Sequence, residues 1–432
     1  MKNILTYIQQ NFSIDFLLLF FYCLISLTPN FGSIDKSISQ WVYISLLNVI
    51  SLLYIAYNFK SYKIYTSLNK SLIFIAFSIF IVSILISFFQ AFNILESIIK
   101  FSHWFNLYCA FIIFFFLISK TPRKLLIATI LLIFTVQIYF TYDGYFKLLE
   151  FVKFDFSYSS FLKGVTGNKN ITATLFGLTI PFIYFLLLST KRIFFSILLS
   201  FFLVCSFYAV FILGARTSYV IIGFLILVYI FAILHYYFRS QKNRNFLLLS
   251  LFKLFIPFLL SLIIFSNFDG NSNSIQIQDR AQTINVKDES VNIRIKFYKL
   301  ALEEFSRSPI TGIGAGNWKI KSVDLYKKNI DGYIAPYHVH NDFLEVAVET
   351  GLLGLIPFIL IFLSILIYTR FSIIRSKSFT DFIFNYTLLI IAGLYVIDSL
   401  LNFPHARPVI SIFFMIILSL ISLEYFKSRK HE

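Results

Sequence analysis

The sequence predicts an all-α polytopic membrane protein that crosses the bilayer about twelve times. Hydrophobic residues make up 58% of the 432 residues and charged residues only 13%, whereas a soluble domain is roughly half apolar and a quarter charged. The apolar residues lie in runs long enough to cross a bilayer as helices. Composition and run length together therefore indicate a polytopic bundle of helices.

The predicted spans follow from the rule that a helix of roughly 20 apolar residues crosses the bilayer. The first span is short. The ranges are 14–29, 41–57, 71–89, 98–118, 124–141, 170–189, 193–213, 217–238, 246–266, 347–369, 383–401 and 407–424. The chain accordingly divides into an N-terminal bundle of about nine spans over 1–266, a large loop over 267–346, and about three C-terminal spans over 347–432.

The connections between spans alternate in charge, and this alternation predicts the orientation. The net charge of +16 does not indicate a nucleic-acid partner, because the basic residues form short clusters between apolar runs. The basic connections contain Lys60, Lys63 and Lys70; Lys120, Arg123 and Lys124; Lys191 and Arg192; Arg239, Lys242 and Arg244; Arg370, Arg375 and Lys377; Lys427, Arg429 and Lys430. By the positive-inside rule both termini are cytoplasmic, and the loop 267–346 faces the periplasm of a cell with two membranes.

The loop 267–346 is long enough to be functional, since structureless loops above roughly 15 residues are uncommon. Its first third, 267–290, is polar and is predicted to be flexible. The segment VNIRIKFYKLALEEFSRSP, 291–309, carries apolar residues at helical spacing and ends at a proline, which predicts an amphipathic helix on the outer membrane face. A second short helix is predicted over 318–329.

Two arginines on the predicted outer side are candidate anion ligands. Arg216 lies in LGARTSYV, among small and polar residues that would let a substrate approach. A guanidinium stays charged and presents a fork of donors that suits phosphate oxygens. Arg216 is otherwise a snorkelling residue at a helix end, and Arg294 is otherwise a solvated cation on the surface helix. A histidine on the same membrane side strengthens the functional interpretation of both.

His338 and His340 lie in PYHVHNDFLEVAVETGLLG, directly before an apolar span. Three interpretations are open: a metal set with Asp342 and Glu345, polar capping with Asn341 as the helix N-cap, or catalysis. The zinc patterns of proteins use other spacings, so no metal and no cofactor is predicted. In the catalytic interpretation the helix dipole disfavours an imidazolium at His340, which keeps the ring neutral and able to act as a general base.

Two further motifs precede predicted spans or helices. The glycines of GIGAGN, 312–317, do not match the dinucleotide fingerprint and predict a tight turn whose backbone amides are candidate anion ligands. Asn168 and Asn170 are candidate helix caps or sugar contacts, and we favour capping for both.

These motifs together resemble the O-antigen ligase and polymerase superfamily. The similarity rests on Arg294 followed by PITGIGAGN, then HVHNDFLE and ETGLLG. LGARTSYV resembles the membrane arginine motif of the superfamily, and GNKNITA resembles its Asn-rich segment before a span. DSLLNFPHARP is similar to the closing segment, with Asn402 where some members carry Asp. The resemblance covers roughly residues 165–425.

The resemblance implies a metal-independent, inverting membrane glycosyltransferase of the GT-C class in the bacterial inner membrane. Its implied donor is a glycan on undecaprenyl diphosphate, and its acceptor is a lipid A-core sugar or a growing glycan. It implies that Arg216 and Arg294 hold the diphosphate, that His340 is the base and that His338 supports it. The remaining supporting candidates are Asn170, Asn341 and Glu349.

Ligation to lipid A-core is favoured over polymerisation of repeat units, because the histidine-bearing loop is single and compact. The second alternative is a transporter or flippase for a lipid-linked sugar. That alternative needs a polar path through the bilayer, and the predicted spans contain few charges, namely Lys100, His103 and Asp398.

Overall fold

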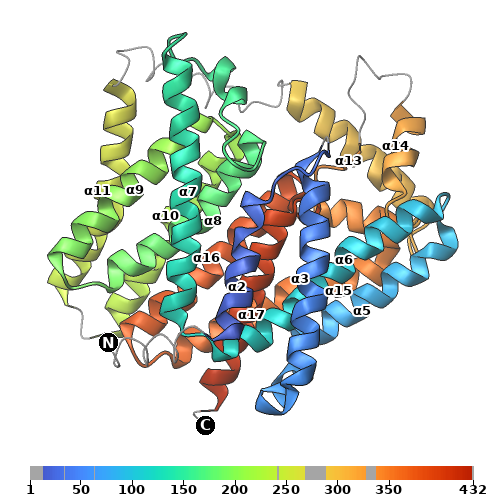
Figure 1. The fold of residues 1–432 in the computed structure, drawn as a ribbon, viewed down its shortest axis with the longest axis horizontal. Helices are drawn as coiled ribbons and strands as arrows, with labels where there is room; N and C mark the ends of the chain where they lie inside the picture. Colours follow the sequence, from blue (N-terminus) through green and yellow to red (C-terminus); the bar gives the residue numbers. More distant parts are fainter. Residues whose placement is uncertain are drawn as a thin grey trace.

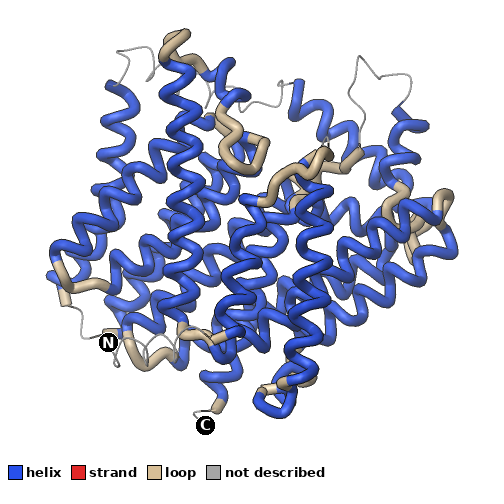
Figure 2. Tube along the Cα trace, in the orientation of Figure 1, coloured by secondary structure: helices blue, strands red, loops and turns tan. Residues whose placement is uncertain are grey.

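The computed structural model describes residues 13–430 except 34, 63, 241–242, 268–288 and 327–336. Every regular element in this described part is a helix (Figures 1 and 2). Eleven of the described helices are long and apolar enough to cross a membrane. The protein is therefore an all-α polytopic membrane protein, as predicted.

The predicted spans agree with the helices to within a few residues at most ends. The spanning helices are α3 (Lys36–Tyr57), α5 (Leu72–Ser87), α6 (Ile94–Lys120), α7 (Arg123–Leu149), α8 (Lys169–Ser189), α9 (Ile193–Leu213), α10 (Arg216–Arg239), α11 (Arg244–Asn267), α15 (Asp342–Arg375), α16 (Phe379–Leu401) and α17 (Pro408–Arg429). The short first span corresponds to α2 (Ile14–Cys23), which continues as the 3₁₀ helix η1 (Leu24–Leu27).

The other helices lie in the connections, and all of them except α13 are short. These are η2 (Phe59–Ser61), α4 (Tyr65–Leu68), η3 (Phe88–Gln90), η4 (Phe156–Phe161), α13 (Glu289–Arg307), α14 (Trp318–Tyr326) and η6 (Pro404–Ala406). The predicted span 124–141 is too short, because α7 continues as a helix to Leu149. The first eight residues of the predicted connection 142–169 thus belong to a helix.

The C-terminal helices pack into the bundle that the N-terminal helices form. Figure 1 shows α7 to α11 on one side, α3, α5, α6 and α15 on the other, and α2, α16 and α17 between them. α15 packs on α5, α17 on α6, and α16 on α8. Residues far apart in the sequence therefore meet in the centre of the molecule.

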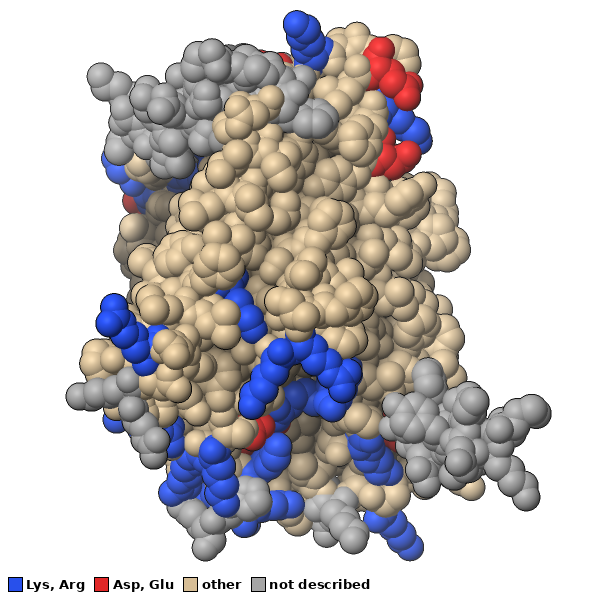
Figure 3. Space-filling model, turned by 90° about the vertical axis from the view of Figure 1, so that its left-hand side faces the viewer, with Lys and Arg blue, Asp and Glu red and all other residues tan. Residues whose placement is uncertain are grey.

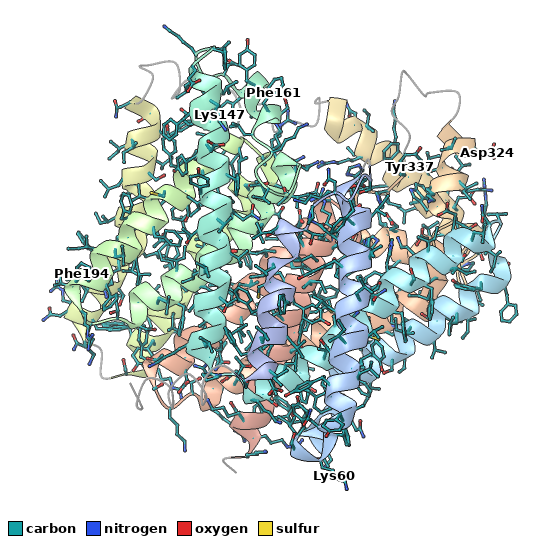
Figure 4. The ribbon with its side chains drawn as sticks, in the orientation of Figure 1. Lys60, Lys147, Phe161, Phe194, Asp324 and Tyr337 are labelled. Atoms are coloured by element: carbon teal, nitrogen blue, oxygen red, sulfur yellow. The ribbon has the colours of Figure 1, made fainter. Side chains whose placement is uncertain are left out.

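The two ends of the bundle differ in charge. Lys60 lies at the lower end of the molecule, whereas Lys147, Phe161 and Tyr337 lie toward the upper end (Figure 4). On the face drawn in Figure 3, lysine and arginine side chains gather toward the lower end. This separation agrees with the alternating charge of the connections. The assignment of the lower end to the cytoplasm rests on the charge pattern alone.

The large loop carries the predicted amphipathic helix, α13, which packs on α15. Phe297 and Ala301 are buried, as helical spacing predicts for its apolar face. α13 begins at Glu289, so Arg294 lies in its second turn. α14 corresponds to the predicted helix 318–329, whose last three residues lie outside the described part of the chain. Most of the segment predicted to be flexible, 267–290, also lies outside it.

Candidate active site

The start of α15 positions the two histidines. Asn341 is the N-cap, and its side-chain oxygen accepts a hydrogen bond from the amide of Leu344 at 3.1 Å, as predicted. His340, directly before it, has a φ of +62°. This left-handed conformation is uncommon for a non-glycine residue, and such residues cluster at functional sites.

His340 is enclosed by aromatic side chains and by α13. Its ring centroid lies 4.9 Å from that of Phe403, edge to face, and 6.4 Å from that of Phe297. The Tyr298 hydroxyl donates to the His340 carbonyl oxygen at 2.9 Å. The His340 Nδ1 is buried and has no hydrogen-bond partner among the described residues. α13 therefore covers the imidazole and holds its backbone.

This environment keeps His340 neutral. Burial, followed by the positive charge of Arg294, lowers the pKa of His340 to about 4. The neutral ring expected from the sequence is thus supported, but the cause is different. Desolvation and neighbouring cations lower this pKa, in place of the helix dipole expected from the sequence.

Asn402 joins the two segments that carry the candidate arginines. Its side-chain oxygen lies 3.5 Å from an Arg294 guanidinium nitrogen on α13, and its amide nitrogen lies 3.4 Å from the Thr217 hydroxyl. Thr217 follows Arg216, the first residue of α10. Gly214 ends α9 with a φ of +58°, so the chain turns sharply into α10. Asn402 therefore contacts both the start of α10 and the second turn of α13.

His338 is held by a carboxylate. Its Nδ1 lies 3.1 and 3.2 Å from the two carboxylate oxygens of Glu345. Glu345 also accepts a hydrogen bond from the amide of Val339 at 3.1 Å. The His338 ring stacks on Phe403 with centroids 4.1 Å apart. A carboxylate on one ring nitrogen selects the tautomer and orientation of an imidazole, so Glu345 positions His338.

A buried cluster of charged side chains contacts His338 through Glu345. The sequence did not predict that these side chains lie together. The Lys100 Nζ lies 2.7 Å from Glu345 and 3.4 Å from Glu349. The Asp342 carboxylate lies 2.6 Å from the His405 Nδ1. Lys100 within an apolar span was the available signal, because charges inside a membrane are costly and usually functional. Glu349, a predicted supporting residue, therefore belongs to this cluster.

The geometry does not favour the metal interpretation of His338, His340, Asp342 and Glu345, which the sequence left as an alternative. In the described part of the chain, no group of three or more His, Cys, Asp or Glu side chains is placed to hold a metal ion. Asp342 contacts His405, and Glu345 contacts Lys100 and His338. The carboxylates that the metal interpretation used thus have partners within the protein.

The glycine-rich turn was correctly predicted, but its role as an anion site was wrong. The amides of Ile313 and Gly314 donate to the carbonyl oxygens of Val348 and Glu349 at 2.9 and 3.0 Å, and the amide of Ala315 donates to the Ser87 hydroxyl. These backbone donors are consumed by protein acceptors. The turn instead allows close backbone contact, since a Cβ at Gly312, whose φ is +71°, would lie 2.4 Å from the backbone of α15.

The prediction for the Asn-rich segment was half right. Asn168 is the N-cap of α8, and its side chain accepts hydrogen bonds from the amides of Asn170 and Ile171 at 2.8 and 3.4 Å. The capping role predicted for Asn170 is wrong, because Asn170 lies inside the first turn with an exposed side chain. One Asx cap is enough for this helix start.

A cavity of about 1610 Å³ lies beside His338. His338, Glu345, Glu349 and Phe403 contribute to its wall. The opposite wall comes from the first turns of α3 and from α6. The candidate site therefore contains a half-buried imidazole, that of His340, and a large space next to His338, with Phe403 in contact with both.

Comparison with known families decides the kind of site. Residues 201–359 match the model of the O-antigen ligase family. This stretch is similar to the O-antigen ligase family. The match contains Arg216, Arg294, His338 and His340, and it confirms the resemblance drawn from the motifs. No curated protein matches the chain. The match supports a ligase- or polymerase-like, glycosyltransferase-like role in O-antigen assembly, with lipid-linked glycans as the implied substrates.

Proposed function

We propose that this protein transfers a glycan from undecaprenyl diphosphate to a sugar hydroxyl of a lipid A-core acceptor. The reaction takes place at the periplasmic face of the bacterial inner membrane, with both termini in the cytoplasm. The proposal rests chiefly on one observation. Arg294, His340 and the start of α10 at Arg216 come from segments far apart in the chain and meet around Asn402 and Phe403.

In the proposed reaction His340 accepts the proton of the acceptor hydroxyl. The hydroxyl oxygen forms a bond to the anomeric carbon, and the bond between that carbon and the phosphate oxygen breaks. The electron pair leaves with undecaprenyl diphosphate, so the anomeric configuration inverts. Arg216 and Arg294 stabilise the negative charge that develops on the leaving diphosphate, because preplaced cations act most strongly on charge that grows in the transition state.

The surroundings of the histidines fit these two roles. The lowered pKa leaves His340 unprotonated and ready to accept a proton. His338 is held by Glu345 and stacks on Phe403, the same aromatic ring that His340 meets edge to face. We propose that His338 orients the acceptor, while Asn341 and Glu349 act only by holding the start of α15.

The acid limb of the pH profile is expected to lie near pH 4. Because the base is lost as the pH falls through the pKa of His340, kcat/KM should be flat from about pH 5 to 7 and fall about tenfold per pH unit below 4. The measurement is glycan transfer in proteoliposomes between pH 3.5 and 7. Activity at pH 7 after exposure to pH 3.5 controls for unfolding, and a limb near 6.5 would contradict the assigned environment.

Ligation and polymerisation differ in what accumulates when the gene is deleted. We expect mass analysis of cell glycolipids to show polymer attached to the carrier and unmodified lipid A-core. Single repeat units on the carrier would instead identify a polymerase. Movement of the sugar-lipid across liposomes without a new glycosidic bond would favour the transporter alternative and exclude the proposed transfer.

A further inference from the structure

The cavity of about 1610 Å³ is separate from the proposed diphosphate site. Its wall contains residues of α3, α6 and α14 and of the segment 166–168, together with His338. Arg216, Arg294 and His340 are absent from the described residues that line it. Most of the wall therefore lies outside the stretch 201–359 that matches the O-antigen ligase family.

Most charges in the cavity wall have a close partner within the protein, and Arg407 is the exception. The Arg407 guanidinium lies over the Phe403 ring, 4.6 Å from its centroid, and its buried Nη1 has no hydrogen-bond partner among the described residues. Lys319 forms an ion pair with Glu96, and Lys100 with Glu345 at 2.7 Å. Lys36 donates to two main-chain carbonyl oxygens at 3.0 and 2.5 Å. The ion pairs of Lys319 and Lys100 neutralise two of the cations in this wall, which leaves Arg407 and Lys36 as dispersed single charges instead of the clustered arginines that suit a diphosphate. The cavity suits a ligand with many hydroxyl groups.

The remaining wall offers aromatic faces and amides. The Trp41 indole stacks on the His103 imidazole with centroids 4.2 Å apart and planes 7° apart. Tyr337 and Asn106 also line the cavity. Flat aromatic surfaces with a few placed amide and hydroxyl groups bind ligands that have both apolar and hydrogen-bonding faces. Sugar rings have both.

Phe403 separates the cavity from His340. It lines the cavity, its ring stacks on His338 at 4.1 Å, and its edge faces the His340 ring at 4.9 Å. A saccharide in the cavity thus has its end next to Phe403, and its terminal hydroxyl has to pass the edge of this ring to reach the proposed base. A small-molecule pocket is typically about 300 to 1,000 Å³, so this cavity has room for several sugar units.

We infer that this cavity binds the acceptor glycan, and that the N-terminal helices α3 and α6 select the acceptor. The inference rests on the proposed transfer reaction and adds where the second substrate is held. The donor diphosphate binds on the other side of Phe403, near Arg216 and Arg294. Residues outside the stretch 201–359 therefore largely determine which acceptor binds.

The test fills the cavity without disturbing packing. Val42 and Val49 lie one heptad apart on α3, and each is 57% exposed. Val42 lines the cavity, whereas Val49 is not among the described residues that line it. We expect Val42→Trp to raise the KM for the acceptor at least tenfold while the KM for the donor changes less than twofold. Val49→Trp should leave both unchanged.

The assay uses the full chain in proteoliposomes, with carrier-linked glycan and unmodified lipid A-core, both isolated from a deletion strain. His103→Asn, which removes the ring that stacks on Trp41, is a second variant with the same expectation. An unchanged acceptor KM in both variants, or an equal rise in the donor KM, would overturn the inference. If the unmodified protein forms no glycosidic bond, the proposed function itself fails, which is a distinguishable result.

Discussion

His340→Asn is expected to lower the rate of glycan transfer by roughly 10²- to 10⁴-fold, the usual contribution of a general base. Asparagine cannot accept the proton of a sugar hydroxyl at neutral pH. It nevertheless tolerates the left-handed φ of +62° found at this position, so the turn before α15 is retained. The measurement is kcat for transfer in proteoliposomes, with donor binding measured separately.

The choice of asparagine separates chemistry from folding. His340→Ala should lose the same activity, but alanine in a left-handed conformation also costs about 1 kcal/mol. His235→Ala is the matched control, since His235 lies on α10 and its Nδ1 is 2.6 Å from the Tyr386 hydroxyl, far along the helix from Arg216. Near-normal transfer by His340→Asn would rule His340 out as the base.

Arg294→Lys and Arg216→Lys are each expected to lower kcat/KM by roughly 10- to 100-fold. A hydrogen bond to a charged group contributes about 1.5–3 kcal/mol, and a lysine replaces the planar fork with a point charge. Arg294 lies 3.5 Å from the Asn402 side chain, so its guanidinium position is defined by a neighbour that lysine would contact differently. The loss of kcat/KM should come from the step in which the bond between the anomeric carbon and the diphosphate oxygen breaks.

Arg307→Lys provides the control on the same helix. Arg307 lies at the end of α13, its side chain is 62% exposed, and it pairs with Glu304 one turn earlier. Its replacement should not alter transfer. An unchanged rate in Arg216→Lys would contradict a role in diphosphate binding and indicate that Arg216 is a snorkelling residue at a helix end. An unchanged rate in Arg294→Lys would indicate that Arg294 is a solvated cation of the surface helix.

The spans were predictable because their signal is local. Each apolar run contains the information for its own helix, so the predicted ranges differ from the helices by a few residues. The error at α7 arose because the residues from Tyr142 to Leu149 mix polar and apolar side chains yet continue the helix. Asn341 was predictable as a cap for the same reason, since capping involves only the next few amides.

The buried cluster was not predictable because its signal is not local. Lys100 and Glu345 are 245 residues apart, and Asp342 and His405 are 63 apart. The residues near Lys100 in the chain do not indicate which carboxylates it pairs with. The anion role of the glycine-rich turn failed for a related reason. Free amides were inferred from a local turn, and distant acceptors on α15 and α5 occupy them.

The aromatic wall formed by Phe403 has a consequence for the kinetic scheme. Arg216 and Arg294, the residues of the proposed donor site, are not among the described residues that line the cavity proposed for the acceptor, so the two substrates do not compete for the same space. Either can load first, and a ternary complex forms before any bond is broken. The enzyme then has no need of a covalent glycosyl intermediate, and excess of one substrate should not inhibit turnover of the other.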